Sequence, residues 1–471
     1  MGTNLRLSRG KRKRRRGAGI WEKASSFPLK KYRKTNEHLH TVFCCFSAEP
    51  VAQRTMLQGG SVQLLCLTAD SGVPLFCRGA TRQLPFSVIG SLNGVHMFSV
   101  GQDVLLSSCE TERGGHVVWN VFHESIMLIA VSGQGAEAVC EFQLRRLLEN
   151  VWNCMVLVLG LDELVNVRNV ERLKRDLRSC YQLIDSFLEA SGQWMGELTH
   201  CVDCLLPPQP APLQEALDAF THAADSEFGC LLVHGKVVAA TEKWWRLTPQ
   251  EVVLLATLVR SLGGTACCDQ PVFLPQGSPT VAHRLLRFQL LPGTDVCVLC
   301  GPNPSLQRAE SELVARFWSP LVDVLRGCLA LKDRCLPDSV TLHKDMLGLL
   351  LISRESNRAI SSVSLAVRLP GAPSVARRWE LLRLFFVFAI TRYFVQDEVP
   401  QVQSRGPLQE DFALGFSHQP LQCYLVTEEC KCFGLQTLQH QLYLLTPLSV
   451  PTFALRPLAA RTLSALTATG F

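Results

Sequence analysis

The residues with the clearest chemical potential lie in a glycine-containing turn after a predicted strand. Gly133, Gly135 and Ala138 have the spacing of a dinucleotide-binding turn, and a predicted helix follows them. That type of site also needs a second parallel strand, which ends about twenty residues later in an acidic residue that binds the ribose. Two predicted helices occupy this part of the sequence instead. The pattern therefore indicates a tight connection between strand and helix, and we expect no cofactor.

A second candidate, for nucleophilic catalysis, is the stretch LPFSVIGSLNGVHMF at residues 84–98. A nucleophile elbow requires Gly-x-Ser-x-Gly with the serine at the turn between strand and helix. Here Gly90 directly precedes Ser91, and the predicted turn lies earlier, at residues 83–85. The sequence also lacks a Walker loop, a His-Glu-x-x-His pair, paired carboxylates and kinase motifs, so we expect no catalytic residue.

Two Cys-x-x-Cys pairs have the spacing of zinc ligands. Cys297 and Cys300 lie in a predicted strand, where residues three apart point to opposite faces and cannot bind one ion. Cys201 and Cys204 follow a predicted helix beside His200, and their spacing would allow metal binding. The alternative is a set of reduced, buried thiols, as expected for 20 cysteines in a chain that begins without a signal-peptide core. We favour the second interpretation and expect no metal.

Charge is unevenly distributed along the chain. Residues 1–34 contain 13 lysines and arginines and one acidic residue, whereas the remainder has more acidic than basic residues. The part of the chain after residue 34 therefore lacks the basic character of a nucleic-acid-binding protein. The run Lys11–Arg16 could be a nuclear-localisation or anionic-membrane signal, but a disordered, self-repelling arm is the commoner structure for such a run. We expect residues 1–57 to form a basic, disordered extension.

The most apolar run, residues 381–390, is too short to span a bilayer and contains Arg383. We therefore expect a soluble, intracellular protein.

The elements that must position any functional residue follow one plan three times. Apolar hairpins are predicted at residues 61–79, 228–242 and 345–365, and each is followed by a helix, three further strands and closing helices. The helix at 248–264 has the clearest start, because Thr248 can cap it, Pro249 fits its first turn and Glu251 lies three residues after the cap. Proline-containing segments at 206–213 and 333–339 separate the repeats. This order predicts an α+β fold in which helices cover both faces of antiparallel sheets.

The predicted helix that contains Gly90 is apolar on more than one side. Phe86, Asn93 and Met97 share one side with residue 89 or 90, whereas Val88, Leu92 and Val95 line another. One side would pack on the sheet. The other would contact either a partner or another element of the same domain, and the sequence leaves both alternatives open.

Two further segments could contact partners. Trp244 and Trp245 could anchor a partner, although packing in the core and at its edge is the favoured interpretation. The amphipathic segment 168–188 carries a basic strip, Arg172, Arg175 and Arg178, that could meet an acidic partner or anionic lipid. A solvated helix face is the commoner role of such a strip.

Several characteristic runs lie between about residue 60 and the end of the chain, among them LPFSVIGSLNGVHMF, LVNVRNVERLKRDLR, VVAATEKWWRL and LCGPNPSL. In these runs the chain resembles the Fuzzy family of planar cell polarity effectors. The resemblance implies three longin domains, each a five-stranded antiparallel sheet between helices, like the subunits of the vacuolar Mon–Ccz Rab activator. With the predicted hairpins, it places the domains at residues 58–200, 214–332 and 343–471, with linkers at 201–213 and 333–342.

The resemblance also implies a function. Members of this family are expected to pair with Inturned as a guanine nucleotide exchange factor for a Rab GTPase. With Fritz, a WD-repeat protein, they are expected to form the CPLANE complex at the basal body of the cilium, in the cytoplasm and cytoskeleton. That complex would support ciliogenesis, intraflagellar transport and hedgehog signalling. The alternative is a scaffold or trafficking adaptor of the same complex.

An exchange factor acts by binding one conformation of the GTPase more tightly than another, so it needs no side chain for bond chemistry. On this interpretation the chain is not an enzyme in the sense of bond chemistry. The candidates for the partner interface are Val88, Leu92, Val95 and Met97, and the basic strip is a candidate for contact with anionic lipid.

Overall fold

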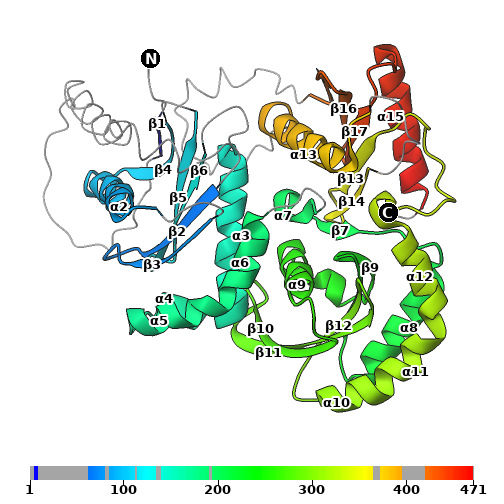
Figure 1. Ribbon diagram of the computed structural model, residues 1–471, viewed down its shortest axis with the longest axis horizontal. Helices are drawn as coiled ribbons and strands as arrows, with labels where there is room; N and C mark the ends of the chain where they lie inside the picture. The colour runs from blue at the N-terminus through cyan, green and yellow to red at the C-terminus, as the bar shows by residue number, and fades with distance from the viewer. Residues whose placement is uncertain are drawn as a thin grey trace, which may run out of the picture. The chain divides into compact units, whose positions relative to one another are not determined.

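The computed structural model describes residues 5–8, 62–79, 84–111, 114–133, 139–189, 194–363, 372–394 and 420–469. The chain divides into two units, residues 1–189 and 190–471 (Figure 1). Each unit is described by itself below.

The first unit is built on an antiparallel sheet with helices on both faces. The strand order is β1-β4-β5-β6-β2-β3. The strands are β1 (Leu5–Ser8), β2 (Val62–Thr68), β3 (Pro74–Gly79), β4 (Leu105–Glu110), β5 (His116–Phe122) and β6 (Ile126–Ser132). Helix α2 (Phe86–Gly101) covers one face and α3 (Glu141–Leu159) covers the other (Figure 1). Six consecutive residues of β2 are buried because both of its faces are covered.

The first unit ends in a series of short helices. They are α4 (Leu161–Val165), α5 (Val170–Asp176) and α6 (Tyr181–Leu188), with a 3-10 turn at Leu177–Cys180 between the last two. Leu173, Leu177, Ile184 and Phe187 are buried, as the three-and-four spacing of the segment predicts. The side chains of Arg78 on β3 and Asp185 on α6 form an ion pair, with Nε donating to Oδ1 at 2.9 Å. This pair ties the last helix to the edge of the sheet.

The second unit contains one 11-stranded sheet, in which two sets of five strands lie on either side of the short strand β7. The strand order is β10-β11-β12-β8-β9-β7-β14-β13-β17-β16-β15. The strands are β7 (Val202–Cys204), β8 (Phe228–Val233), β9 (Lys236–Ala240), β10 (Cys267–Leu274), β11 (Ser278–Leu291), β12 (Thr294–Cys300), β13 (Gly348–Ser353), β14 (Arg358–Ser362), β15 (Gln422–Val426), β16 (Lys431–Gln436) and β17 (His440–Thr446). The short strand β7 pairs in parallel with both β9 and β14.

One strand order therefore occurs three times in the described residues. In each repeat the third, fourth, fifth, first and second strands lie side by side. The α+β prediction of repeated antiparallel sheets between helices is confirmed. The segment 201–213, which we predicted to be a linker, contains β7 and the start of helix α8 (Pro210–Ala223).

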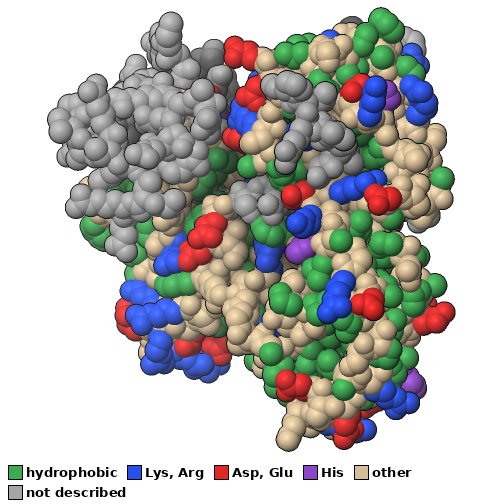
Figure 2. Space-filling view, turned by 45° about the vertical axis from the view of Figure 1, so that its right-hand side comes forward, with side chains coloured by type: hydrophobic (Ala, Val, Ile, Leu, Met, Phe, Trp, Pro, Cys, Tyr) green, Lys and Arg blue, Asp and Glu red, His purple; other side chains and the backbone are tan. Residues whose placement is uncertain are grey.

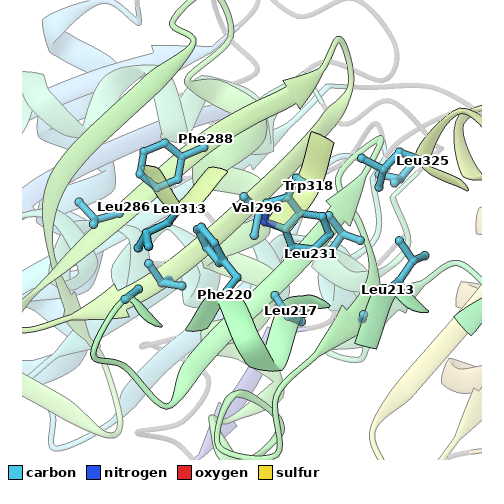
Figure 3. Packing of buried hydrophobic residues seen from close by; sticks show 14 of the residues in the cluster. Leu213, Leu217, Phe220, Leu231, Leu286, Phe288, Val296, Leu313, Trp318 and Leu325 are labelled. Carbon is cyan, nitrogen blue, oxygen red and sulfur yellow. The ribbon is translucent and has the colours of Figure 1, made fainter. Parts of the chain in front are cut away.

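The helices of the second unit lie on both sides of its sheet (Figure 1). They are α7 (Gly196–Thr199), α8, α9 (Pro249–Ser261), α10 (Leu306–Arg308), α11 (Ala315–Trp318), α12 (Val322–Ala330), α13 (Val375–Arg392) and α15 (Thr452–Thr467). Figure 3 shows Leu213, Leu217 and Phe220 of α8 directed toward strand residues such as Leu231. The Phe220 ring meets Phe288 edge to face, with centroids 6.3 Å apart.

The predicted start of the helix at 248–264 is confirmed. Thr248 accepts a hydrogen bond from the backbone N–H of Glu251, and the Glu251 carboxylate accepts one from the backbone N–H of Thr248 at 3.0 Å. The same buried carboxylate accepts hydrogen bonds from the backbone N–H groups of Gln276 and Gly277 at 2.9 and 2.8 Å. A capping residue that the sequence identifies locally therefore also fixes the turn between β10 and β11.

Candidate partner-binding surface

Helix α2 of the first unit buries one apolar side against the sheet. Leu92 and Val95 are 1% and 2% exposed and belong to a hydrophobic cluster with Leu65 and Ile129. The indole N–H of Trp119 donates a hydrogen bond to the backbone carbonyl of Leu92 at 3.3 Å. This side of the helix is therefore fixed in the core of the domain.

The opposite side of α2 is apolar and exposed. Phe86 is 79% exposed and Met97 is 43% exposed. A Cβ atom added at Gly90, Gly94 or Gly101 would have no neighbour within 4 Å. Residues 86, 90, 94, 97 and 101 are spaced three or four apart, so they lie along one side of the helix. We call this side the α2 surface; it offers bare backbone between two large apolar side chains.

The structure separates the four predicted interface residues. Leu92 and Val95 contribute to the core, Val88 is half-buried against the same cluster, and Met97 lies on the α2 surface. Our prediction combined residues from both sides of the helix and omitted Phe86. The spacing of Phe86 from Gly90 and Gly94 was the signal for the exposed side, since small residues permit close approach of another backbone.

Acidification is expected to weaken the first unit through His96, which lies on the buried side of α2. His96 is 4% exposed, and within the described residues its Nδ1 atom has no hydrogen-bond partner. Burial lowers the pKa of His96 from the ordinary value of 6.5. A lowered pKa means that the neutral ring stabilises the fold above pH 6.5, and that this contribution is lost as the pH falls through the folded-state pKa.

Urea denaturation at about pH 7.5 and about pH 5.5 measures this effect, because the two values lie on either side of the ordinary histidine pKa. We expect His96→Leu to reduce the loss of stability between the two conditions. The wild-type chain under the same two conditions is the reference for this comparison. An equal loss of stability between the two pH values in the wild type and in His96→Leu would contradict the prediction.

The basic strip is exposed but partly neutralised. All three arginines lie on the surface of the first unit. Arg172 forms ion pairs with Asp176 and Glu163 at 3.3 and 3.4 Å, and Arg175 lies 3.7 Å from Asp176. On the face that Figure 2 shows, acidic and basic side chains of the described residues are interspersed. The local charge pattern is therefore that of a solvated helix face, and contact with anionic lipid stays a prediction.

Trp244 and Trp245 have the packing role that we favoured. They lie in a 3-10 turn, where Trp244 is 1% exposed. The guanidinium of Arg358 on β14 lies 3.7 Å from the centroid of the Trp245 ring. The pair thus belongs to the core and its edge, and it offers no free aromatic anchor.

The cysteine pairs do not converge on a metal-binding geometry. Over the ranges that the structure describes, no three His, Cys, Asp or Glu side chains are placed to hold an ion. The Cys201 and Cys204 thiols lie instead within 3.6 and 3.4 Å of the backbone carbonyls of Thr199 and Val202. The glycine turn continues into residues 134–138, which lie outside the described residues, as does the basic run Lys11–Arg16.

Among the described helices, none is both long enough and apolar enough to cross a bilayer.

Comparison with known proteins identifies the three repeats. Residues 62–187, 224–319 and 345–469 match the family models for the first, second and third longin domains of FUZ, MON1 and HPS1. The chain is 52% identical over 418 residues to the protein fuzzy homolog of Xenopus tropicalis, and 49% identical over 422 residues to that of Homo sapiens. These alignments cover 87% of this chain and 99% and 98% of the two relatives. The chain therefore belongs to the Fuzzy family of planar cell polarity proteins, which are built from three longin domains.

Proposed function

We propose that this chain is one subunit of a two-subunit guanine nucleotide exchange factor for a Rab GTPase, and that Inturned is the other subunit. Membership of a longin family that includes MON1 supports this proposal. The exposed α2 surface carries it, because an isolated domain gains nothing from a phenylalanine that is 79% exposed beside bare glycine backbone. A subunit that must be covered by a second longin protein would have such a surface.

The chemistry of the α2 surface fits a protein partner with an apolar helix or strand. Phe86 and Met97 provide large apolar side chains, and aromatic residues frequently dominate the binding energy of interfaces. Gly90 and Gly94 between them would let the partner's backbone approach closely. Exchange would then follow from tighter binding of the nucleotide-poor GTPase by the joint surface of the two subunits.

Release of fluorescent GDP from a panel of Rab GTPases tests this function. We expect acceleration with the co-purified pair and none with this chain or Inturned alone. A stable pair without exchange activity would favour the alternative function, a scaffold or trafficking adaptor of the same complex. Failure of the two proteins to co-purify would contradict the shared-surface proposal.

A double variant of the α2 surface tests the site itself. We expect Phe86→Asp with Met97→Asp to weaken binding to Inturned by at least about tenfold, because two desolvated apolar contacts become buried charges. Surface plasmon resonance with immobilised Inturned measures the affinity. Phe453→Asp is the matched control, since Phe453 on α15 is 84% exposed but lies in the third domain. Equal losses in both variants would contradict the assignment.

We further propose that the pair acts with Fritz in the CPLANE complex at the basal body, and supports ciliogenesis, intraflagellar transport and hedgehog signalling there. The same α2 double variant tests this step in cells that lack the endogenous protein. A tagged wild-type chain should restore cilia from the basal body, and the variant should not. Rescue by a variant that no longer binds Inturned would show that pairing is dispensable for this role.

A further inference from the structure

A buried lysine lies where the second and third domains meet. Lys236 on β9 is 5% exposed, and its Nζ atom lies 3.2 Å from the Cys335 sulfur and 3.2 Å from the Ser361 hydroxyl oxygen. Nζ also lies 4.9 Å from the centroid of the Trp379 ring on α13. Within the described ranges no carboxylate forms an ion pair with Nζ, and Asp203 on the shared strand β7 acts on it only at longer range. The amine therefore faces a thiol, a hydroxyl and a ring.

Cys335 is held in this contact by an unusual backbone. Its φ angle is +55°, in the left-handed region that non-glycine residues rarely adopt. The Cys335 carbonyl accepts a hydrogen bond from the N–H of Leu206 at 3.1 Å, and its thiol lies 3.3 Å from the Lys332 carbonyl. Burial raises the pKa of the Cys335 thiol, and nearby Lys236 acts in the opposite direction. The surrounding contacts thus hold the sulfur next to the amine although the backbone of Cys335 has an unfavourable conformation.

We propose that Lys236 and Cys335 are a modification site at which molecular oxygen forms an Nζ–O–Sγ crosslink. The amine loses one N–H hydrogen, the thiol loses its S–H hydrogen, and the O–O bond breaks. One oxygen atom forms the N–O and O–S bonds, and the other leaves with the two hydrogens as water. Nitrogen and sulfur together lose four electrons, which reduce the two oxygen atoms of dioxygen.

The contact geometry favours this product over a direct S–N bond. A sulfenamide would require nitrogen and sulfur to close the whole distance from 3.2 Å to one covalent bond. A bridging oxygen keeps the two atoms farther apart, so less movement of the fixed backbone is needed. Dioxygen is small and apolar, and apolar interiors admit molecules of this kind. The crosslink would covalently join β9 of the second domain to the segment that leads into the third.

Peptide mapping of the full chain tests the proposal. Protein purified without reductant is kept in dioxygen-saturated buffer, denatured, alkylated and digested with trypsin. We expect the peptide that contains Lys236 to remain joined to the peptide that begins at Cys335, with uncut backbone after Lys236. Its mass should equal the two peptides plus one oxygen less two hydrogens. Treatment with a phosphine reductant should release both peptides and lower the thermal midpoint of the native protein by at least about 2 °C.

Two variants and one control test whether Lys236 and Cys335 are the crosslinked residues. Lys236→Arg keeps a positive charge but removes the primary amine, and Cys335→Ser removes the sulfur, so both should lose the crosslinked species. Cys204→Ser removes another buried thiol from the neighbouring strand β7 and should retain it. Three results would overturn the proposal: full recovery of both unmodified wild-type peptides, a disulfide or sulfinic acid at Cys335 with normal cleavage at Lys236, or persistence of the species in Lys236→Arg. The peptide map of the wild-type chain tests the proposal even if a variant fails to fold.

Discussion

Replacing Arg287 by methionine is expected to destabilise the second domain by about 3–5 kcal/mol. Arg287 on β11 has a side chain that is 2% exposed, and its Nε and Nη2 atoms lie 2.8 and 2.6 Å from Oδ1 of Asp295 on β12. Burial raises the pKa of Asp295, and the guanidinium of Arg287 opposes that shift. Methionine would fill most of the volume but leave a buried carboxylate without its partner. Urea denaturation of the wild type and variant at neutral pH measures the loss.

The double variant Arg287→Met with Asp295→Leu is the matched control. It should recover most of the stability, since two apolar residues need neither charge nor partner. The difference in unfolding free energy between the wild type and Arg287→Met should also become smaller in acid. A pKa raised in the folded state makes the protonated carboxyl stabilising below the unfolded value, and this stabilisation is lost as the pH rises through the folded value. A double variant as unstable as the single one would contradict this account of the pair.

Replacing Leu92 by alanine is expected to destabilise the first unit by about 2–5 kcal/mol. The side chain lies in the core between α2 and the sheet, and its truncation would leave a cavity beside Leu65 and Ile129. Phe86→Ala on the opposite side of the same helix should change the unfolding free energy by less than about 0.5 kcal/mol, because Phe86 is already exposed.

The two alanine variants should therefore behave in opposite ways. Leu92→Ala should lower the thermal midpoint while the remaining folded protein still binds Inturned, whereas Phe86→Ala should reduce binding without lowering the midpoint. Differential scanning calorimetry and binding measured on the same samples separate the two effects. Equal destabilisation by both variants would mean that both sides of α2 are covered within the folded chain.

The sequence by itself determined the repeated order of the elements. Alternating apolar hairpins and the Thr248–Glu251 capping box depend on neighbours within a few residues, and such signals act locally. They predicted three repeats of two strands, a helix, three strands and closing helices. Within the described residues, each repeat has two strands, a helix, three strands and then at least one helix. The runs shared with the Fuzzy family then sufficed to predict three longin domains.

Only the tertiary structure decided which side of α2 is free. The sequence shows two apolar stripes on this helix, and a helix that is apolar all round gives no preference for either. The sheet makes the choice, since Leu92 and Val95 fit its cluster while Phe86 and Met97 do not reach it.

The contact between the second and third domains could not be predicted from the sequence either, for a related reason. Strand β7 lies in a segment that we predicted to be a linker, because three residues are too few to show the alternation of a strand. Its two neighbouring strands, β9 and β14, come from later parts of the sequence. Lys236 and Cys335 are separated by 99 positions, and neither residue type indicates a contact with the other. Their approach follows from the pairing of β7 with β9 and β14, so it exists only once the two domains have formed one sheet.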